Sequence, residues 1–134
     1  MLAEFLTEYH KRYTLPVPWG ALAVPVPLHP RRERVRGFNQ AALIAEEFAA
    51  RNGLEYRGAV LSRFRNTASQ VTLSLEQRKK NMEGAFLVRE SSAVKGRKVM
   101  LFDDVATSGA TLEEAARALK AAGAKRIWAI TVAH

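Results

Sequence analysis

The segment from Val99 to Thr111 limits the possible folds more than any other part of this 134-residue chain. It starts with a continuous apolar run, Val99 to Phe102, which is typical of a strand buried on both faces of a sheet. Asp103 and Asp104 end the predicted strand, and a turn of small and hydroxylated residues follows. Because helices must cover both faces of such a strand, the segment favours an α/β fold.

The residues that follow this turn complete a strand–helix–strand unit. Apolar residues at helical spacing from Leu112 to Ala122 predict a helix that stops at Gly123. Ile127 to Val132 predicts a second buried strand. A unit of this kind joins parallel strands through a crossover that we expect to be right-handed.

The first half of the chain predicts a similar alternation. The apolar segment from Ala21 to Leu28 predicts a strand. Pro25 and Pro27 cannot donate hydrogen bonds to a neighbouring strand, so this strand either lies at a sheet edge or ends early, near Val26. Asn39 is predicted to cap the next helix and Gly53 to stop it. Its buried face is predicted to consist of Ala41, Ile44, Ala45 and Phe48.

Shorter elements complete the prediction. They are a helix near residues 2–9, a strand at 58–62, a mobile loop at 63–72, a helix from Ser74 to Asn81 and a strand from Ala85 to Val88. We therefore expect one domain over residues 1–134, with a mainly parallel twisted sheet flanked by helices. Residues 1–19 are expected to be a helical segment that packs on this domain.

Composition excludes several classes of protein. The chain has no cysteine, which removes disulfides, zinc ribbons, iron–sulfur clusters and thiol nucleophiles. No apolar run approaches the ~20 residues of a membrane helix, and Glu4 and Glu8 do not fit a secretory signal. A cytoplasmic protein without a membrane span is expected. The net charge of +8 favours phosphate-bearing partners, although solubility alone also explains it.

The predicted turn after Asp104 has the chemistry of a sugar-phosphate site. In open α/β sheets, ligands bind at the carboxyl ends of the strands. Two adjacent carboxylates there can accept hydrogen bonds from ribose hydroxyls, and the amides and hydroxyls of the turn favour a phosphate. The predicted phosphate-binding residues are Thr107, Ser108, Gly109, Ala110 and Thr111. As an alternative, Thr111 and Glu114 fit a capping box, T-x-x-E, in which the hydroxyl bonds a backbone N–H.

Residues Val99 to Thr111 closely resemble the signature of type I phosphoribosyltransferases, which bind 5-phosphoribosyl-1-pyrophosphate (PRPP). The resemblance implies a type I phosphoribosyltransferase-like fold, with the 5-phosphate on residues 107–111 and catalytic carboxylates at Asp103 and Asp104. It also implies Mg²⁺ carried by PRPP, with no direct protein ligand set. Relatives that use 6-oxopurines often have an acid where Thr107 stands, so transfer to hypoxanthine or guanine is not expected.

A second set of residues resembles ComF-type proteins, phosphoribosyltransferase-like proteins associated with natural competence and DNA uptake. The resemblance covers about residues 20–134. Its residues are Val24 to His29, Gly37 to Gln40, Arg65, Thr67, Gln70, Arg78, Asn81 and Gly84 to Phe86. Members often begin with a cysteine-rich zinc module, and this chain has none.

The family reading also implies a pyrophosphate-binding loop near the end of the first strand and a mobile loop over the substrate. The candidates are Leu28, His29, Arg31 and Arg65. Two of them have simpler interpretations: His29 as a structural or surface residue, and Arg31 as part of a solvated basic turn or as a contact to a nucleic-acid backbone.

Three function classes follow from these residues. The chain is a phosphoribosyltransferase with an unidentified acceptor, a PRPP-sensing protein without catalysis, or a nucleic-acid-binding competence factor. Single-stranded DNA, competence proteins and further copies of the chain are candidate partners.

Overall fold

The computed structural model describes residues 17–28, 39–63, 84–105 and 109–133, of which 104, 105, 132 and 133 are described by their backbone. Its main sheet has four parallel strands in the order β2-β1-β5-β6. These are β1 (Leu22–Pro25), β2 (Glu55–Tyr56), β5 (Lys98–Val105) and β6 (Arg126–Ala133). A separate antiparallel pair consists of β3 (Leu61–Arg63) and β4 (Phe86–Val88).

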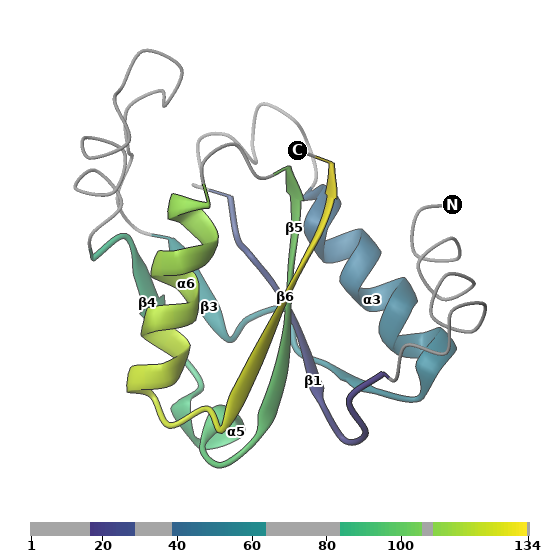
Figure 1. Ribbon diagram of the computed structural model, residues 1–134, viewed down its shortest axis with the longest axis horizontal. Coiled ribbons are helices and arrows are strands. Elements are labelled where there is room, and N and C mark those ends of the chain that lie inside the picture. Colours follow the sequence, from purple (N-terminus) through teal and green to yellow (C-terminus); the bar gives the residue numbers. More distant parts are fainter. Residues whose placement is uncertain (1–16, 29–38, 64–83, 106–108, 134) are drawn as a thin grey trace.

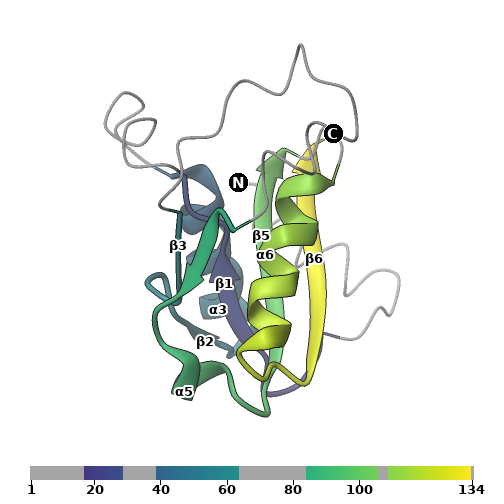
Figure 2. The same ribbon diagram turned by 90° about the vertical axis from the view of Figure 1, so that its left-hand side faces the viewer.

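Helices cover both faces of the main sheet, as Figure 1 shows with α3 on one side and α6 on the other. The helices are α3 (Gln40–Asn52), the one-turn α5 (Ser91–Val94) and α6 (Ala110–Ala121). Figure 2 shows α6 lying against β5 and β6. The expected α/β architecture, a parallel sheet flanked by helices, is confirmed.

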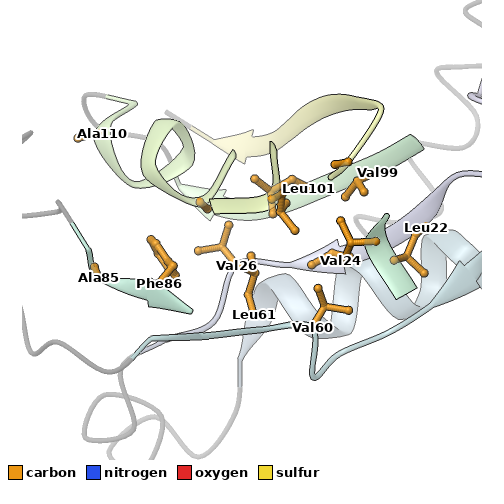
Figure 3. Packing of buried hydrophobic residues seen from close by; sticks show 14 residues of the cluster. Leu22, Val24, Val26, Val60, Leu61, Ala85, Phe86, Val99, Leu101 and Ala110 are labelled. Carbon is orange, nitrogen blue, oxygen red and sulfur yellow. The ribbon is translucent and has the colours of Figure 1, made fainter. Parts of the chain in front are cut away.

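Alternating residues of the strands supply two hydrophobic cores, one on each face of the sheet. On one face, Leu22, Val24 and Leu101 pack against α6 and against the β3–β4 pair, which contributes Leu61 and Phe86 (Figure 3). On the other face, Ala23, Met100 and Phe102 pack against α3. The period of two along β1 and β5 thus gives each helix its own buried surface.

The prediction for α3 is confirmed in detail. The Asn39 side chain accepts a hydrogen bond from the Ala41 N–H at 3.0 Å, and Gly53 ends the helix with a φ of 66°. The four residues that were predicted to face the core are all buried.

Strand β1 ends at Pro25 as expected, but it lies inside the sheet and not at its edge. The Val26 N–H donates to the Phe102 carbonyl of β5 at 2.8 Å, so Pro25 faces the β2 side. Because β2 has only two residues and pairs with Leu22 and Ala23, no strand needs a donor from Pro25.

The structure corrects other predicted elements. Strand β5 continues through both acids to Val105, because β6 pairs alongside it as far as Ala133. Arg63 belongs to β3 and not to a loop, and both β2 and α5 were missed. The predicted helices at 2–9 and 74–81 lie outside the described residues.

Strand β6 differs most from its prediction. It was expected to be buried, but it lies at the edge of the sheet, with Ala129 exposed and its apolar neighbours only half-buried. Within the described residues, no helix is long and apolar enough to cross a bilayer.

Candidate functional site

The carboxyl ends of β1 and β5 meet at one edge of the sheet, where α6 also begins. The strands are parallel neighbours in register, with Pro25 opposite Phe102. This edge lies at the top of Figure 1, and the first turn of α6 stands beside it. The fold therefore brings the end of β1 next to the end of β5 and the start of α6, at the edge where open α/β sheets bind ligands.

Asp103 is buried at this edge, with only 9% of its surface exposed. It stands opposite Thr131 of β6 and is still part of the β5 ladder. Asp104 follows it inside the same strand. Both acids thus belong to β5, which continues past the point where the sequence predicted its end, and the strand fixes the position of Asp103 at this edge.

Gly109 is the N-cap of α6 and has a φ of 78°, in the left-handed region that favours glycine. Its carbonyl accepts the first helical hydrogen bond, from the Glu113 N–H at 2.8 Å. Among the described residues, an added Cβ at Gly109 would meet no heavy atom within 4 Å beyond its chain neighbours. No described side chain therefore fills the space beside Gly109, at the positive end of the α6 dipole, where an anion is favoured.

The capping-box interpretation of Thr111 and Glu114 is wrong. Helix α6 begins at Ala110, so Thr111 is its second residue and not its cap. The Glu114 carboxylate accepts a hydrogen bond from the Gly84 N–H at 3.3 Å and lies 3.7 Å from the Arg117 guanidinium. Glu114 thus connects α6 to the backbone two residues before β4.

Helix α3 begins at the same edge of the sheet. The Asn39 side-chain amide donates to the Val26 carbonyl at 3.2 Å, while its oxygen caps the first turn of α3. The sequence predicted the cap but not the bond to the end of β1. Two helix N-termini therefore direct their positive ends to this edge, and this adds to the preference for an anionic ligand.

The remaining candidates fall mostly outside the described residues. Leu28 is half-buried three residues after β1, next to the edge described above. Ala110 is buried at the start of α6, and Thr111 is half-buried. The other candidates, Thr107, Ser108, His29, Arg31 and Arg65, are not in the described ranges.

Shifted pKa values occur at the opposite, amino end of the sheet. Hydrogen bonds from Arg97, at 2.8 Å, and from Arg57, at 2.6 Å, lower the pKa of Glu55. The Arg97 guanidinium also donates to the Gly20 carbonyl at 3.2 Å. This cluster joins the starts of β1, β2 and β5 and has a structural role remote from the candidate site.

The described residues hold no group of three or more His, Cys, Asp or Glu side chains that could bind a metal ion. Magnesium keeps much of its shell as water and substrate oxygen, so one or two carboxylates suffice where the ligand brings a diphosphate. The buried Asp103 fits a metal that arrives with its substrate, and no closed protein cage is present in these ranges.

The sequence model of the phosphoribosyl transferase domain matches residues 35–134. The chain belongs to this family. The match includes β5, the start of α6 and both acids, so the family's characteristic segment is the one that forms the candidate site here.

Relatives with names from DNA biology cover most of the chain. DNA utilization protein YhgH of Escherichia coli K12 is 35% identical over 93% of this chain and 55% of its own length. Competence protein F of Haemophilus influenzae is 33% identical over 78% of this chain and 46% of its own length. The chain thus spans about half the length of these relatives. The resemblance to ComF-type proteins is confirmed.

Solved structures confirm the fold. A hypoxanthine phosphoribosyltransferase of Staphylococcus aureus aligns with a TM-score of 0.57 and 12% identity, over 97% of this chain and 61% of that one. An adenine phosphoribosyltransferase of Leishmania tarentolae aligns with a TM-score of 0.56 and 17% identity, over 97% and 54%. At such identities the likeness concerns the fold and not the choice of base.

Proposed function

We propose that this chain binds PRPP at the carboxyl edge of the main sheet and transfers its phosphoribosyl group to an acceptor. The observation that carries the proposal is the glycine cap of α6. At Gly109, four residues after the end of the strand that holds two acids, the backbone has a positive φ and no described heavy atom lies where a side chain would stand. A helix N-terminus with this opening suits the 5-phosphate.

In this proposal Asp103 and Asp104 accept hydrogen bonds from the ribose hydroxyls, and residues 107–111 hold the 5-phosphate. Leu28, His29, Arg31 and Arg65 are proposed to face the diphosphate or the loop that covers it. A nucleophilic atom of the acceptor forms a bond to C1 of the ribose, and the bond from C1 to the diphosphate breaks with its electron pair on the leaving oxygen. The developing positive charge on the ribose resembles that in glycoside chemistry, and carboxylates nearby stabilise it.

Magnesium fits this proposal as a companion of the substrate. Bound to the diphosphate, it would neutralise charge on the leaving group. Asp103 and Asp104 are the residues of this chain that we propose to orient the ribose relative to the diphosphate. The chain needs no covalent nucleophile, because positioning and charge stabilisation supply the rate enhancement.

Calorimetric titration of the full chain with PRPP and Mg²⁺ tests binding. A pyrophosphate-release assay over a panel of bases and amines tests transfer. Saturable heat together with acceptor-dependent release supports the transferase. Heat without release from any acceptor would favour the PRPP-sensing alternative, and a flat titration with PRPP and with ribose 5-phosphate would overturn the proposal.

A role in DNA uptake or use is proposed from the names of the relatives and from the net charge of +8. Cationic surfaces bind the phosphate backbone in a salt-dependent way. A mobility shift with single-stranded DNA that weakens steeply between 50 and 200 mM salt would support direct binding. Without a shift at low salt, the role would have to be indirect.

A further inference from the structure

Strand β6 is the outer strand of the sheet that the described residues form. In the described part of the chain it pairs with β5 on one side only, from Arg126 to Ala133. An edge of this length presents a row of backbone donors and acceptors to which another strand can pair, and proteins usually cover or protect such edges.

Next to this edge lies a hollow of about 420 Å³ between α6 and β6, which we call the α6–β6 hollow. Its apolar lining comes from Ala116 on the helix and from Ile127 and Ala129 on the strand. Ile127 and Ala129 are two residues apart and so share one face of β6. A side chain of an added strand that points toward α6 would meet this apolar surface.

The charged lining of the hollow is mainly cationic. It consists of Arg117, Lys120 and Arg126, against the single carboxylate of Glu113. The Lys120 ammonium donates to the Lys125 carbonyl at 3.1 Å, and the Arg117 guanidinium lies 3.7 Å from the Glu114 carboxylate. The Arg126 guanidinium lies over the ring of Trp128, which packs on the other face of β6 from Ile127. Arg117 and Lys120 are therefore the cations that the hollow presents to a negatively charged ligand.

We propose that the α6–β6 hollow binds an acidic, extended peptide segment of a partner protein, which adds to the sheet beside β6. The strand edge supplies main-chain hydrogen bonds, the apolar lining receives alternate side chains, and the cations pair with acidic side chains. The hollow extends along α6 toward Lys120 and the start of β6, away from Gly109, so this site is distinct from the proposed PRPP site.

The charge distribution favours this occupant over two others. A second copy of a chain with a net charge of +8 would bring its own cations against those of the hollow. A nucleic acid would pair with the cations but would leave the strand edge unpaired, and the residues that line the hollow include no aromatic ring on which a base could stack.

The test uses the full chain and a fluorescein-labelled ten-residue peptide of alternating glutamate and valine. Fluorescence anisotropy should show saturable binding that weakens with salt. A peptide of alternating glutamate and proline has the same charge but cannot form a strand, so it should bind at least tenfold more weakly. A lysine–valine peptide should not bind.

Charge reversal locates the site. Arg117→Glu with Lys120→Glu should weaken binding of the glutamate–valine peptide at least tenfold. Arg89→Glu with Lys95→Glu changes the net charge equally on exposed residues outside the hollow, and should have less than a twofold effect. Arg117→Gln with Lys120→Gln provides a milder variant, and thermal melting checks that each variant is folded. Amide chemical shifts of β6 should move when the peptide binds.

Several results would overturn the proposal. They are equal losses in the two reversal variants, equal binding of the proline peptide, or no binding of the glutamate–valine peptide. Shifts of β6 caused by a twelve-residue oligothymidine and not by the peptide would assign the hollow to nucleic acid. Concentration-dependent dimerisation abolished by the Arg117 and Lys120 reversal would assign it to a second copy.

Discussion

Replacing Gly109 with valine should destabilise the chain moderately and abolish phosphate binding, and the two effects can be measured separately. The φ of 78° at Gly109 lies in a region that a β-branched residue rarely adopts. Holding a non-glycine residue there costs about 1–3 kcal/mol of unfolding free energy. An added Cβ meets no heavy atom within 4 Å among the described residues, so no clash of the Cβ with them adds to this cost.

The effect on binding has a different cause. The open space at Gly109 is the proposed position of the 5-phosphate, so a valine side chain would occupy the place of the ligand. We expect the affinity for ribose 5-phosphate and for PRPP to fall at least tenfold, which corresponds to about 1.4 kcal/mol. Calorimetric titration at a temperature well below the melting point measures this loss on folded protein.

Gly53 provides a matched control. It ends α3 with a φ of 66°, and an added Cβ there also meets no heavy atom within 4 Å in the described ranges. Gly53→Val should therefore lower the melting temperature by a similar amount, about 3–5 °C per kcal/mol for a chain of this size. It should leave phosphate binding unchanged. If Gly109→Val loses stability as Gly53→Val does but still binds ribose 5-phosphate normally, the phosphate lies elsewhere.

Three other changes test the site and the scaffold. Asp103→Asn together with Asp104→Asn should weaken PRPP binding at least tenfold in calorimetry, because neutral amides accept weaker hydrogen bonds from ribose hydroxyls; unchanged titration heats would contradict this. Phe48→Ala should cost about 3–5 kcal/mol in urea unfolding, since the ring is fully buried 5.4 Å from the ring of Phe102; a loss below about 1 kcal/mol, the size of a surface change, would refute the packing. Hydrogen bonds from Arg97 and then Arg57 lower the pKa of Glu55, so the ionised carboxylate stabilises the folded chain. This stabilisation is complete at a pH above the usual carboxyl range and is lost as the pH falls through the lowered pKa. Exposure keeps the effect small. The melting temperatures of the chain and of Glu55→Gln should converge as the pH falls below the usual carboxyl range, whereas parallel profiles would contradict the assignment.

The sequence was most informative where a local rule and the tertiary structure agree. Asn39 and Gly53 bound α3 as predicted, because capping and a left-handed C-terminus depend on a few neighbouring residues. The apolar run of Val99 to Phe102 likewise predicted a buried strand, and both faces of that strand carry helices.

The errors arose where pairing partners far apart in the sequence decide the outcome. Asp103 and Asp104 ended the predicted strand because charged residues usually leave a sheet, but β6 extends the ladder past them. Pro25 and Pro27 indicated either a sheet edge or an early strand end, and the early end is what occurs, because the short β2 lets a proline stand in an inner strand. In the same way, T-x-x-E favoured a local cap for Glu114, which in the fold bonds to Gly84, 30 residues away.

The misprediction of β6 has a physical cause that bears on its proposed role. A continuous apolar run such as that from Ile127 to Ile130 indicates a buried strand, but it does not show whether another strand pairs on the far side. In the fold, β5 is the only described partner of β6, so the strand keeps a composition suited to an inner position while it stands at an edge. Such a strand is stabilised by covering its open side. The cations of the α6–β6 hollow then favour an acidic segment beside β6, because its carboxylates gain charge pairing that a neutral or basic segment would lack.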